Sequence, residues 1–266
     1  MMSLMEAALA SGGTALNGNP RIEGVSSDTR TLASGELFVA LKGEHFDGHA
    51  FLEVAAERGA AASMVKSAWA EGRAPGLPLL VVADTRLALG YLGAWWRARF
   101  DIPLIGVTGS NGKTTVKEMT AAILRAQARA DGDDPELAVL ATAGNLNNDI
   151  GLPLMLLRLQ ATHRAAVIEM GMNHPGEIAY LTRLAQPTVA LVNNAQRAHL
   201  AGLGGVAEVA RAKGGIFDGL RPGGTAVSSA DDPCSGLWRA MTAGRRTLTF
   251  GRDQGVDVHG RAEPKS

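Results

Sequence analysis

Residues 105–115, Ile-Gly-Val-Thr-Gly-Ser-Asn-Gly-Lys-Thr-Thr, decide the fold of the second part of the chain. The stretch ends in Gly112-Lys113-Thr114, which is the ending of the common phosphate-binding loop G-x-x-x-x-G-K-[ST]. The first glycine of that pattern is replaced by Val107, and a glycine follows shortly after it at Gly109. The stretch is therefore either a phosphate loop in a variant spelling or a glycine-rich turn that happens to end in Lys-Thr.

The flanking segments favour the phosphate loop. Residues 104–107, Leu-Ile-Gly-Val, are typical of a buried strand, and a helix is predicted from Lys113 to about Arg129. A phosphate site needs these parts because a strand aims the loop, glycines expose backbone N–H groups, and a helix begins directly after. In that geometry Lys113 would contact the outer phosphates, and the hydroxyl of Thr114 would hold Mg²⁺.

Short apolar runs alternate with helical patterns along the rest of the chain. A helix of about fifteen residues, capped by Asp84-Thr85, is predicted before Pro103, and another is predicted over residues 206–220. The predicted strands are 36–42, 79–82, 139–140, 166–168, 189–192, 225–227 and 247–250, with another beginning at 256–258. This alternation predicts βαβ units, and hence an α/β fold with a mostly parallel sheet. The predicted domains are 1–100, a small α/β domain, and 101–266, a P-loop-type domain incomplete at its C-terminus.

Composition indicates an ordinary globular protein. Of 266 residues, 26 are Lys or Arg and 26 are Asp or Glu, so net charge suggests neither a nucleic-acid partner nor an anionic membrane. The apolar run near residues 152–159 is too short to span a bilayer, and the first residues lack the basic region of a signal peptide. The single cysteine, Cys234, excludes an intrachain disulfide and indicates a cytoplasmic location with an ordinary thiol.

Residues 108–115, Thr-Gly-Ser-Asn-Gly-Lys-Thr-Thr, resemble the ATP loop of the Mur ligases, in which the first glycine is shifted in this way. These enzymes add amino acids to the peptidoglycan precursor UDP-N-acetylmuramic acid. Other stretches resemble the same family in order along the chain, namely residues 26–30, 37–49, 142–151, 167–177 and 192–199. The 144–151 and 169–178 runs are most similar to the member that acts last, whose substrates are UDP-N-acetylmuramoyl-tripeptide and D-alanyl-D-alanine.

The resemblance implies binding residues for ATP and for the UDP precursor. For ATP they are Thr108, Gly109, Ser110, Asn111, Gly112, Lys113, Thr114 and Thr115. For the UDP end they are Ser27, Asp28 and Arg30, and for the cleft that holds the peptide and the ATP phosphates they are Thr142, Asn145 and Asn148. The implied reaction passes through an acyl phosphate, and no nucleic acid or membrane insertion is expected.

Glu169, His199 and Lys213 complete the expected catalytic set with Lys113. Glu169 ends a predicted strand, and a carboxylate at the carboxyl edge of such a sheet faces the ligand crevice, where it can bind Mg²⁺. By resemblance, His199 helps to hold a second Mg²⁺, and Lys213 is carbamylated by CO₂. Without the family resemblance, the three residues would be interpreted as a surface carboxylate at a strand end, a solvated loop histidine and an ordinary helix lysine.

Members of the family carry a third, C-terminal domain that closes over ATP, and this sequence stops before it. We therefore expect a fragment that binds the UDP precursor and binds ATP weakly but does not turn over alone. The alternatives are the neighbouring Mur ligase that adds the third residue, a folylpolyglutamate synthase, which lacks a UDP-binding front domain, and a non-catalytic nucleotide-binding module. Asp47 and His49 could equally shape a loop, and the Trp95-Trp96 pair is expected to serve in packing.

Overall fold

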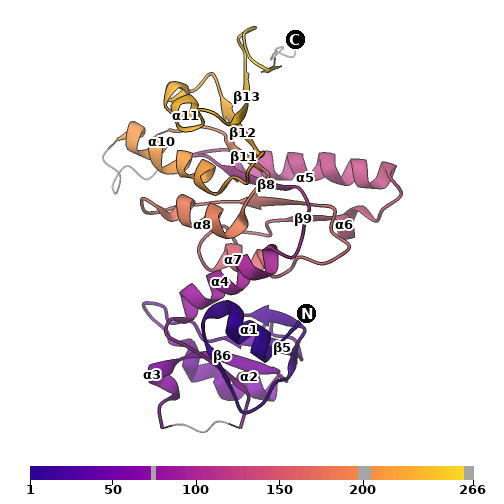
Figure 1. Cartoon of the computed structure of the whole chain (residues 1–266), viewed down its shortest axis with the longest axis vertical. Coiled ribbons are helices and arrows are strands. Elements are labelled where there is room, and N and C mark those ends of the chain that lie inside the picture. Colours follow the sequence, from indigo (N-terminus) through magenta and orange to yellow (C-terminus); the bar gives the residue numbers. More distant parts are fainter. Residues whose placement is uncertain (73–75, 197–204, 261–266) are drawn as a thin grey trace. The chain divides into compact units, whose positions relative to one another are not determined.

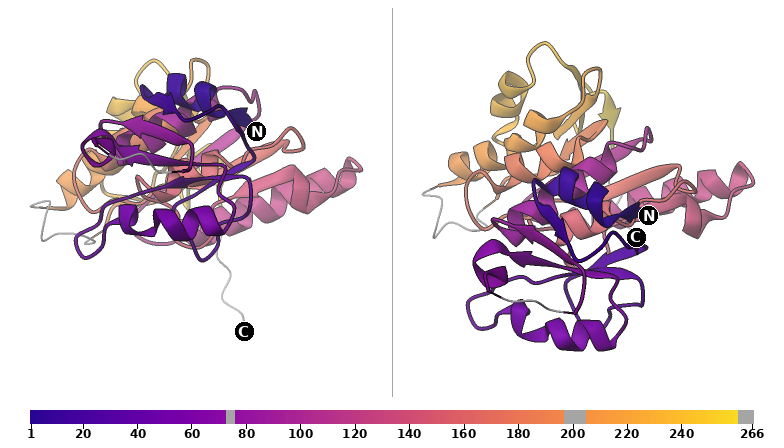
Figure 2. Two further views of the ribbon diagram at one scale, coloured as in Figure 1. Left: turned by 90° about the horizontal axis from the view of Figure 1, so that it is seen from below. Right: turned by 60° about the horizontal axis from the view of Figure 1, so that its bottom comes forward.

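The computed structural model describes residues 1–72, 76–196 and 205–260. The chain divides into two compact units, one formed by Met1–Arg99 with Leu156–Arg158, and the other by Phe100–Met155 with Leu159–Ser266. Figures 1 and 2 show the elements of both units coloured along the chain. Among the described residues, no helix is long and apolar enough to cross a membrane.

The first unit is built on a sheet in the order β2-β7-β6-β5-β4, in which only β2 is antiparallel to its neighbour. Its core gathers apolar side chains such as Phe38, Leu52 and Val65. Its elements are β1 (Met2–Ser3), α1 (Leu4–Ser11), β2 (Thr14–Leu16), β3 (Arg21–Ile22), β4 (Gly24–Ser26), β5 (Glu36–Val39), η1 (Gly48–Phe51), α2 (Leu52–Glu57), β6 (Ala62–Lys66), α3 (Ser67–Ala70), β7 (Leu79–Val82) and α4 (Thr85–Arg97).

The α-helices α1 and α4 of this unit begin at side-chain caps. The Asp84 carboxylate accepts the N–H groups of Arg86 and Leu87, which confirms the predicted start of α4. At α1, Ser3 and Glu6 form a reciprocal capping box. That Ser-x-x-Glu signal was readable in the sequence, although no helix was predicted there.

The second unit contains an all-parallel sheet in the order β14-β13-β12-β11-β8-β10-β9. This confirms the predicted α/β fold with a mostly parallel sheet. From residue 100 onward the elements are β8 (Leu104–Thr108), α5 (Lys113–Ala130), α6 (Pro135–Ala138), β9 (Val139–Ala141), α7 (Gly151–Leu156), β10 (Ala165–Glu169), α8 (Glu177–Ala185), β11 (Val189–Val192), α10 (Val206–Gly214), η2 (Gly215–Gly219), β12 (Thr225–Ser229), α11 (Ser235–Met241), β13 (Arg246–Gly251) and β14 (Val258–His259).

The strand order places the end of β8 at a switch point of the sheet. From β8 the chain runs through α5 towards the β9 edge, whereas from β10 it runs through α8 back across β8 to β11. Right-handed crossovers therefore place α5 and α8 on opposite faces, as Figure 1 shows. In open α/β sheets, ligands bind where such connections diverge, at the carboxyl ends of the strands.

Two predicted elements end earlier than expected. The strand predicted over 36–42 ends at Val39, and the helix predicted over 206–220 ends at Gly214 and continues as the short 3₁₀-helix η2. The glycines at that junction allow close packing, because a Cβ at Gly214 would lie 2.5 Å from Met241 Sδ and one at Gly215 would lie 3.2 Å from Ala179 Cβ. Local periodicity cannot report such contacts between helices.

Candidate functional site

The loop between β8 and α5 has the geometry of a phosphate site. Gly112 precedes the first helical residue with a φ of 74°, in the left-handed region that favours glycine. Within the described residues, the backbone N–H groups of Lys113, Thr114 and Thr115 donate to no backbone or side-chain acceptor. These donors and the positive end of the helix dipole together suit an anion.

Two asparagines after β11 hold the tip of this loop. Asn194 Oδ1 accepts the N–H groups of Ser110 and Asn111 at 3.1 and 3.0 Å, and Asn194 Nδ2 donates to the Asn111 carbonyl at 3.0 Å. Asn193 Nδ2 donates to the same carbonyl at 2.9 Å, and Gln196 Oε1 accepts from the Asn111 side chain. The amides of Ser110 and Asn111, which were expected to bind ATP, are thus engaged within the protein. Sequence reasoning had assigned no role to Asn193 or Asn194.

Glu169 lies beside the loop, at the carboxyl end of β10. Its Oε2 accepts from the Thr114 hydroxyl at 2.9 Å, and its Oε1 accepts from Asn147 Nδ2 at 2.8 Å. Its backbone N–H donates to Thr142 Oγ1 at 2.9 Å, and the residue is only 2% exposed. The structure therefore brings together Thr114 and Glu169, two of the three expected metal ligands, and adds Asn147, which the sequence analysis had not assigned.

The donor chemistry of this pair fits magnesium. Mg²⁺ in nucleotide sites is bound by one or two protein oxygens together with phosphate oxygens and water. The Thr114 hydroxyl and the Glu169 carboxylate supply such oxygens next to the free amides of the loop. Among the described residues, no cluster of three or more His, Cys, Asp or Glu side chains could hold a metal. The third expected ligand, His199, lies outside the described residues.

Lys213 approaches the loop from α10. Its side chain is buried, and Nζ donates to the Gly109 carbonyl at 3.0 Å. The ammonium of Lys113 donates to the Ser110 carbonyl at 3.4 Å. Burial, followed by repulsion from Lys113, lowers the pKa of Lys213 to about 8. A neutral amine at this position is therefore accessible near physiological pH.

Between pH values of about 8 and about 10.5, Lys213 is expected to make the free energy of unfolding rise with pH. Its folded pKa of about 8 lies below the ordinary value of 10.5, so in this window the unfolded chain keeps a proton that the folded chain has released. Urea unfolding across this range should show a steeper rise for the wild type than for Lys213→Met. Equal pH slopes in the two proteins would contradict the lowered pKa.

The other residues expected in the peptide cleft have different environments. Thr142 is 1% exposed, and both its hydroxyl and its carbonyl accept internal hydrogen bonds, so it supports Glu169 from within the fold. Asn148 Oδ1 accepts the N–H groups of Ile150 and Gly151, a conformational role at the start of α7. Asn145 is exposed.

A second candidate site lies in the first unit. Ser27, Asp28 and Arg30 line a pocket of about 490 Å³ with Thr29, Phe38, Phe46, Gly48 and Phe51. Hydrogen bonds from Arg30 lower the pKa of Asp28 to about 2, so this carboxylate stays charged. Phe46 is 59% and Phe51 43% exposed, which offers aromatic surface that sequence reasoning had missed.

His49 and Asp47 shape the loop beside this pocket. Lys66 donates its backbone N–H to His49 Nε2 at 3.1 Å, so the proton of the neutral imidazole lies on Nδ1 and is donated to Asp47 Oδ1. The ring also stacks on Trp69. The structure thus favours the loop-forming interpretation of both residues.

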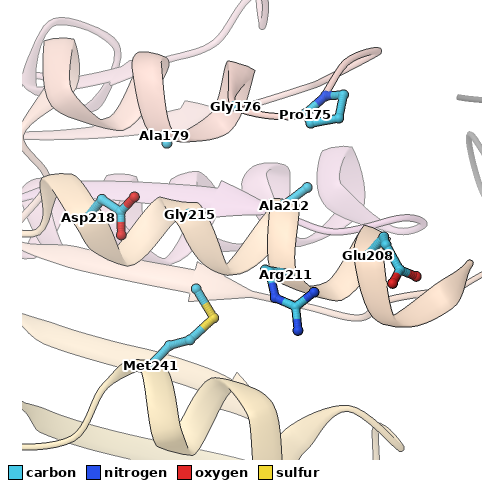
Figure 3. A pocket seen from close by; sticks show the side chains of 9 residues that line it. All are labelled: Pro175, Gly176, Ala179, Glu208, Arg211, Ala212, Gly215, Asp218 and Met241. Atoms are coloured by element: carbon cyan, nitrogen blue, oxygen red, sulfur yellow. The ribbon is translucent and has the colours of Figure 1, made fainter. Parts of the chain in front are cut away.

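A further pocket of about 430 Å³ lies among α8, α10, η2 and α11, and none of the expected site residues lines it (Figure 3). Its lining residues are Pro175, Gly176, Ala179, Glu208, Arg211, Ala212, Gly215, Asp218 and Met241. Arg211 and Lys213 belong to the same helix but point in different directions, because positions two apart diverge around an α-helix. Arg211 lines this pocket while Lys213 contacts the loop.

Two family models match the chain. The Mur ligase family catalytic domain matches residues 21–94, and the Mur ligase middle domain matches residues 107–265. The chain is 49% identical over 221 residues to the UDP-N-acetylmuramoyl-tripeptide–D-alanyl-D-alanine ligase of Haemophilus influenzae. The aligned region covers 83% of this chain and 47% of that protein. The chain spans about half the length of the curated relatives that it matches.

Solved structures of Mur ligases are also similar to this chain. A crystal structure of MurF from Acinetobacter baumannii superposes with a TM-score of 0.85 at 36% identity, covering 96% of this chain and 54% of that one. The structure of MurF from Thermotoga maritima in complex with ADP superposes with a TM-score of 0.73 at 32% identity, covering 88% of this chain and 51% of that one.

Proposed function

The chain belongs to the Mur ligase family, and we propose that it takes part in the ATP-dependent formation of an amide bond in peptidoglycan precursor synthesis. The proposed substrates are UDP-N-acetylmuramoyl-tripeptide and D-alanyl-D-alanine, which appear in the names of its relatives. ATP is the proposed third substrate, supported by the ADP in a related structure. The use of ATP and the single free cysteine favour a cytoplasmic location.

In the proposed reaction, a carboxylate oxygen of the tripeptide attacks the γ-phosphorus of ATP. The bond from phosphorus to the bridging oxygen breaks, ADP leaves with its electron pair, and an acyl phosphate forms. The amine of D-alanyl-D-alanine then attacks the acyl carbon, releases phosphate and loses a proton. Positioning and charge neutralisation dominate such transfers.

The observation that carries this proposal is the Thr114–Glu169 oxygen pair beside the free amides of the loop. The N–H groups of Lys113–Thr115 would bind the ATP phosphates, and the Lys113 ammonium would offset charge on the transferring group. Thr114 and Glu169 would hold Mg²⁺, which would supply further neutralisation of the phosphates.

Two further residues are assigned as part of this proposal. The neutral amine of Lys213 would attack CO₂ and lose a proton to give an anionic carbamate, and its lowered pKa supports this. His199 is proposed as a ligand of a second Mg²⁺.

The first unit is proposed to bind the UDP end of the precursor. Ser27 and Arg30 would donate to the diphosphate, and the exposed rings of Phe46 and Phe51 would contact the base. Asn145, exposed after β9, is proposed to face the peptide and the ATP phosphates, together with Asn148.

Calorimetric titration with UDP-N-acetylmuramoyl-tripeptide tests the substrate assignment. In the presence of Mg²⁺ and a non-hydrolysable ATP analogue, the tripeptide is expected to bind about tenfold or more tightly than the dipeptide precursor, because the third residue adds contacts and hydrogen bonds. UDP alone is the control, since it reports on the first unit without the peptide.

Tighter binding of the dipeptide would move the assignment to the ligase that adds the third residue. Binding of the ATP analogue without either precursor would support a nucleotide-binding module. Absence of binding by a folded chain to nucleotide and precursors alike would refute the proposed function.

A further inference from the structure

Lys117 is a buried ammonium that the proposed mechanism does not use. It lies on α5, one turn after the phosphate loop, and is 2% exposed. Its Nζ donates to the Thr142 carbonyl at 2.9 Å and also contacts the Glu118 carboxylate, which is itself 59% exposed. Lysine almost never occurs fully buried unless it is paired, because removing its charge from water is costly.

One neighbour of Lys117 on the same helix face, Ala121, belongs to an apolar cluster. Ala121, one turn further along α5, is fully buried in a cluster with Val107, Val139 and Val167. An apolar side chain at position 117 would therefore extend this core without burying a charge. Lys117 instead brings a hydrogen-bond donor to the Thr142 carbonyl at the end of β9, and this hydrogen bond explains why a lysine is buried here.

Thr142 connects that donor to the candidate metal site. Its N–H donates to the Val167 carbonyl at 3.0 Å, its carbonyl accepts from Lys117, and its hydroxyl accepts the Glu169 N–H at 2.9 Å. Thr142 also begins the segment that supplies Asn147, whose side chain holds Glu169 Oε1 at 2.8 Å. Both the backbone and the carboxylate of Glu169 are therefore supported by a segment that Lys117 anchors.

We infer that Lys117 is a positioning residue, whose ammonium fixes Thr142 and thereby holds the Glu169 carboxylate against Thr114 in the orientation that receives Mg²⁺. This inference rests on the proposed function, in which Glu169 and Thr114 hold the metal of Mg·ATP. Lys117 itself would touch neither the metal nor the nucleotide. Groups that orient metal ligands in this way typically contribute about 10- to 100-fold to metal affinity.

Lys117→Met tests the inference, because methionine is an unbranched side chain of similar length that can stay buried but cannot donate to the Thr142 carbonyl. The probe is ADP, titrated by calorimetry once in EDTA and once in Mg²⁺. We expect the affinity in EDTA to stay within about twofold of the wild type, because Lys113 and the loop amides are intact. The gain in ADP affinity produced by Mg²⁺ is expected to fall about tenfold. A merely structural role would instead lower the melting temperature and leave the Mg²⁺ gain unchanged.

Glu118→Gln is the matched control. It removes the exposed charge next to Lys117 but keeps an oxygen that can accept from the ammonium, so the Mg²⁺ gain should remain. If Lys117→Met does not fold, Thr142→Val carries the test, because it keeps the carbonyl that Lys117 contacts and removes the hydroxyl that holds Glu169. A selective loss of the Mg²⁺ gain would then support the pathway through Thr142.

The outcomes separate this inference from the proposed function. A wild-type chain that binds ADP equally with and without Mg²⁺ would refute the proposed metal site itself. A wild-type Mg²⁺ gain that persists in the folded Lys117→Met protein, or in Thr142→Val where the first does not fold, would overturn only the role of Lys117.

Discussion

Replacing Lys113 with methionine is expected to weaken binding of ADP or an ATP analogue by about 10- to 100-fold. A hydrogen bond to a charged group is worth about 1.5–3 kcal/mol, and each 1.4 kcal/mol corresponds to about tenfold in affinity. Within residues 1–72, 76–196 and 205–260, the Lys113 ammonium makes one hydrogen bond, a long one of 3.4 Å to the Ser110 carbonyl. Little is therefore lost within the protein when this ammonium turns to a phosphate. Calorimetric titration of the variant measures the effect.

Arg129→Met is the matched control, because it removes a positive charge from the last turn of the same helix. Its effect on nucleotide affinity should stay within about twofold, since exposed charges beyond a Debye length are largely screened. Equal losses in the two variants would indicate that general positive charge, and not the position of Lys113, attracts the nucleotide.

Lys113→Met should also raise the pKa of Lys213, because repulsion from Lys113 contributes to lowering that pKa in the wild type.

The parts of the site that the sequence predicted are those with local signals. Gly112 and the start of a helix at Lys113 follow from residue types that each favour one backbone conformation. Glu169 was placed correctly at the end of its strand, because an apolar run followed by a carboxylate marks a strand that leaves a buried sheet. The α/β class followed from the alternation of such runs with helical patterns.

The missing parts depend on contacts between distant segments. Asn194 accepts a hydrogen bond from the tip of the loop at Ser110, although the two residues are far apart in the sequence. Asn147 reaches Glu169 only because β9 and β10 are adjacent in the sheet. Asparagine is equally typical of a turn, so residue type alone could not separate a turn-forming role from a role in holding the loop or Glu169. Thr142 shows the converse, since a threonine expected to face substrate proves to be buried as a support for Glu169.

Trp238→Ala is expected to lower the free energy of unfolding of the second unit by about 3–5 kcal/mol. Trp238 on α11 has no exposed surface, and its Nε1–H donates to the Ala210 carbonyl of α10 at 2.9 Å. A Cβ at Gly214 would lie 3.2 Å from Trp238 Cδ1, so the indole is packed closely against α10. Truncation would open a cavity between α10 and α11. The two helices already pack closely at Gly214 and Met241, so they have little freedom to move together and fill this cavity. Urea unfolding monitored by circular dichroism gives the change.

Trp238→Phe separates ring volume from hydrogen bonding. Phenylalanine keeps much of the buried aromatic surface but leaves the Ala210 carbonyl without its donor, at an expected cost of about 1–3 kcal/mol. Because α10 also carries Lys213, whose amine reaches Gly109 in the loop, loosening α11 should transmit to the nucleotide site. At temperatures where it remains folded, Trp238→Ala should therefore bind ADP more weakly than Trp238→Phe. Equal stability of the alanine and phenylalanine variants would show that the N–H bond, and not the ring, holds α11 against α10.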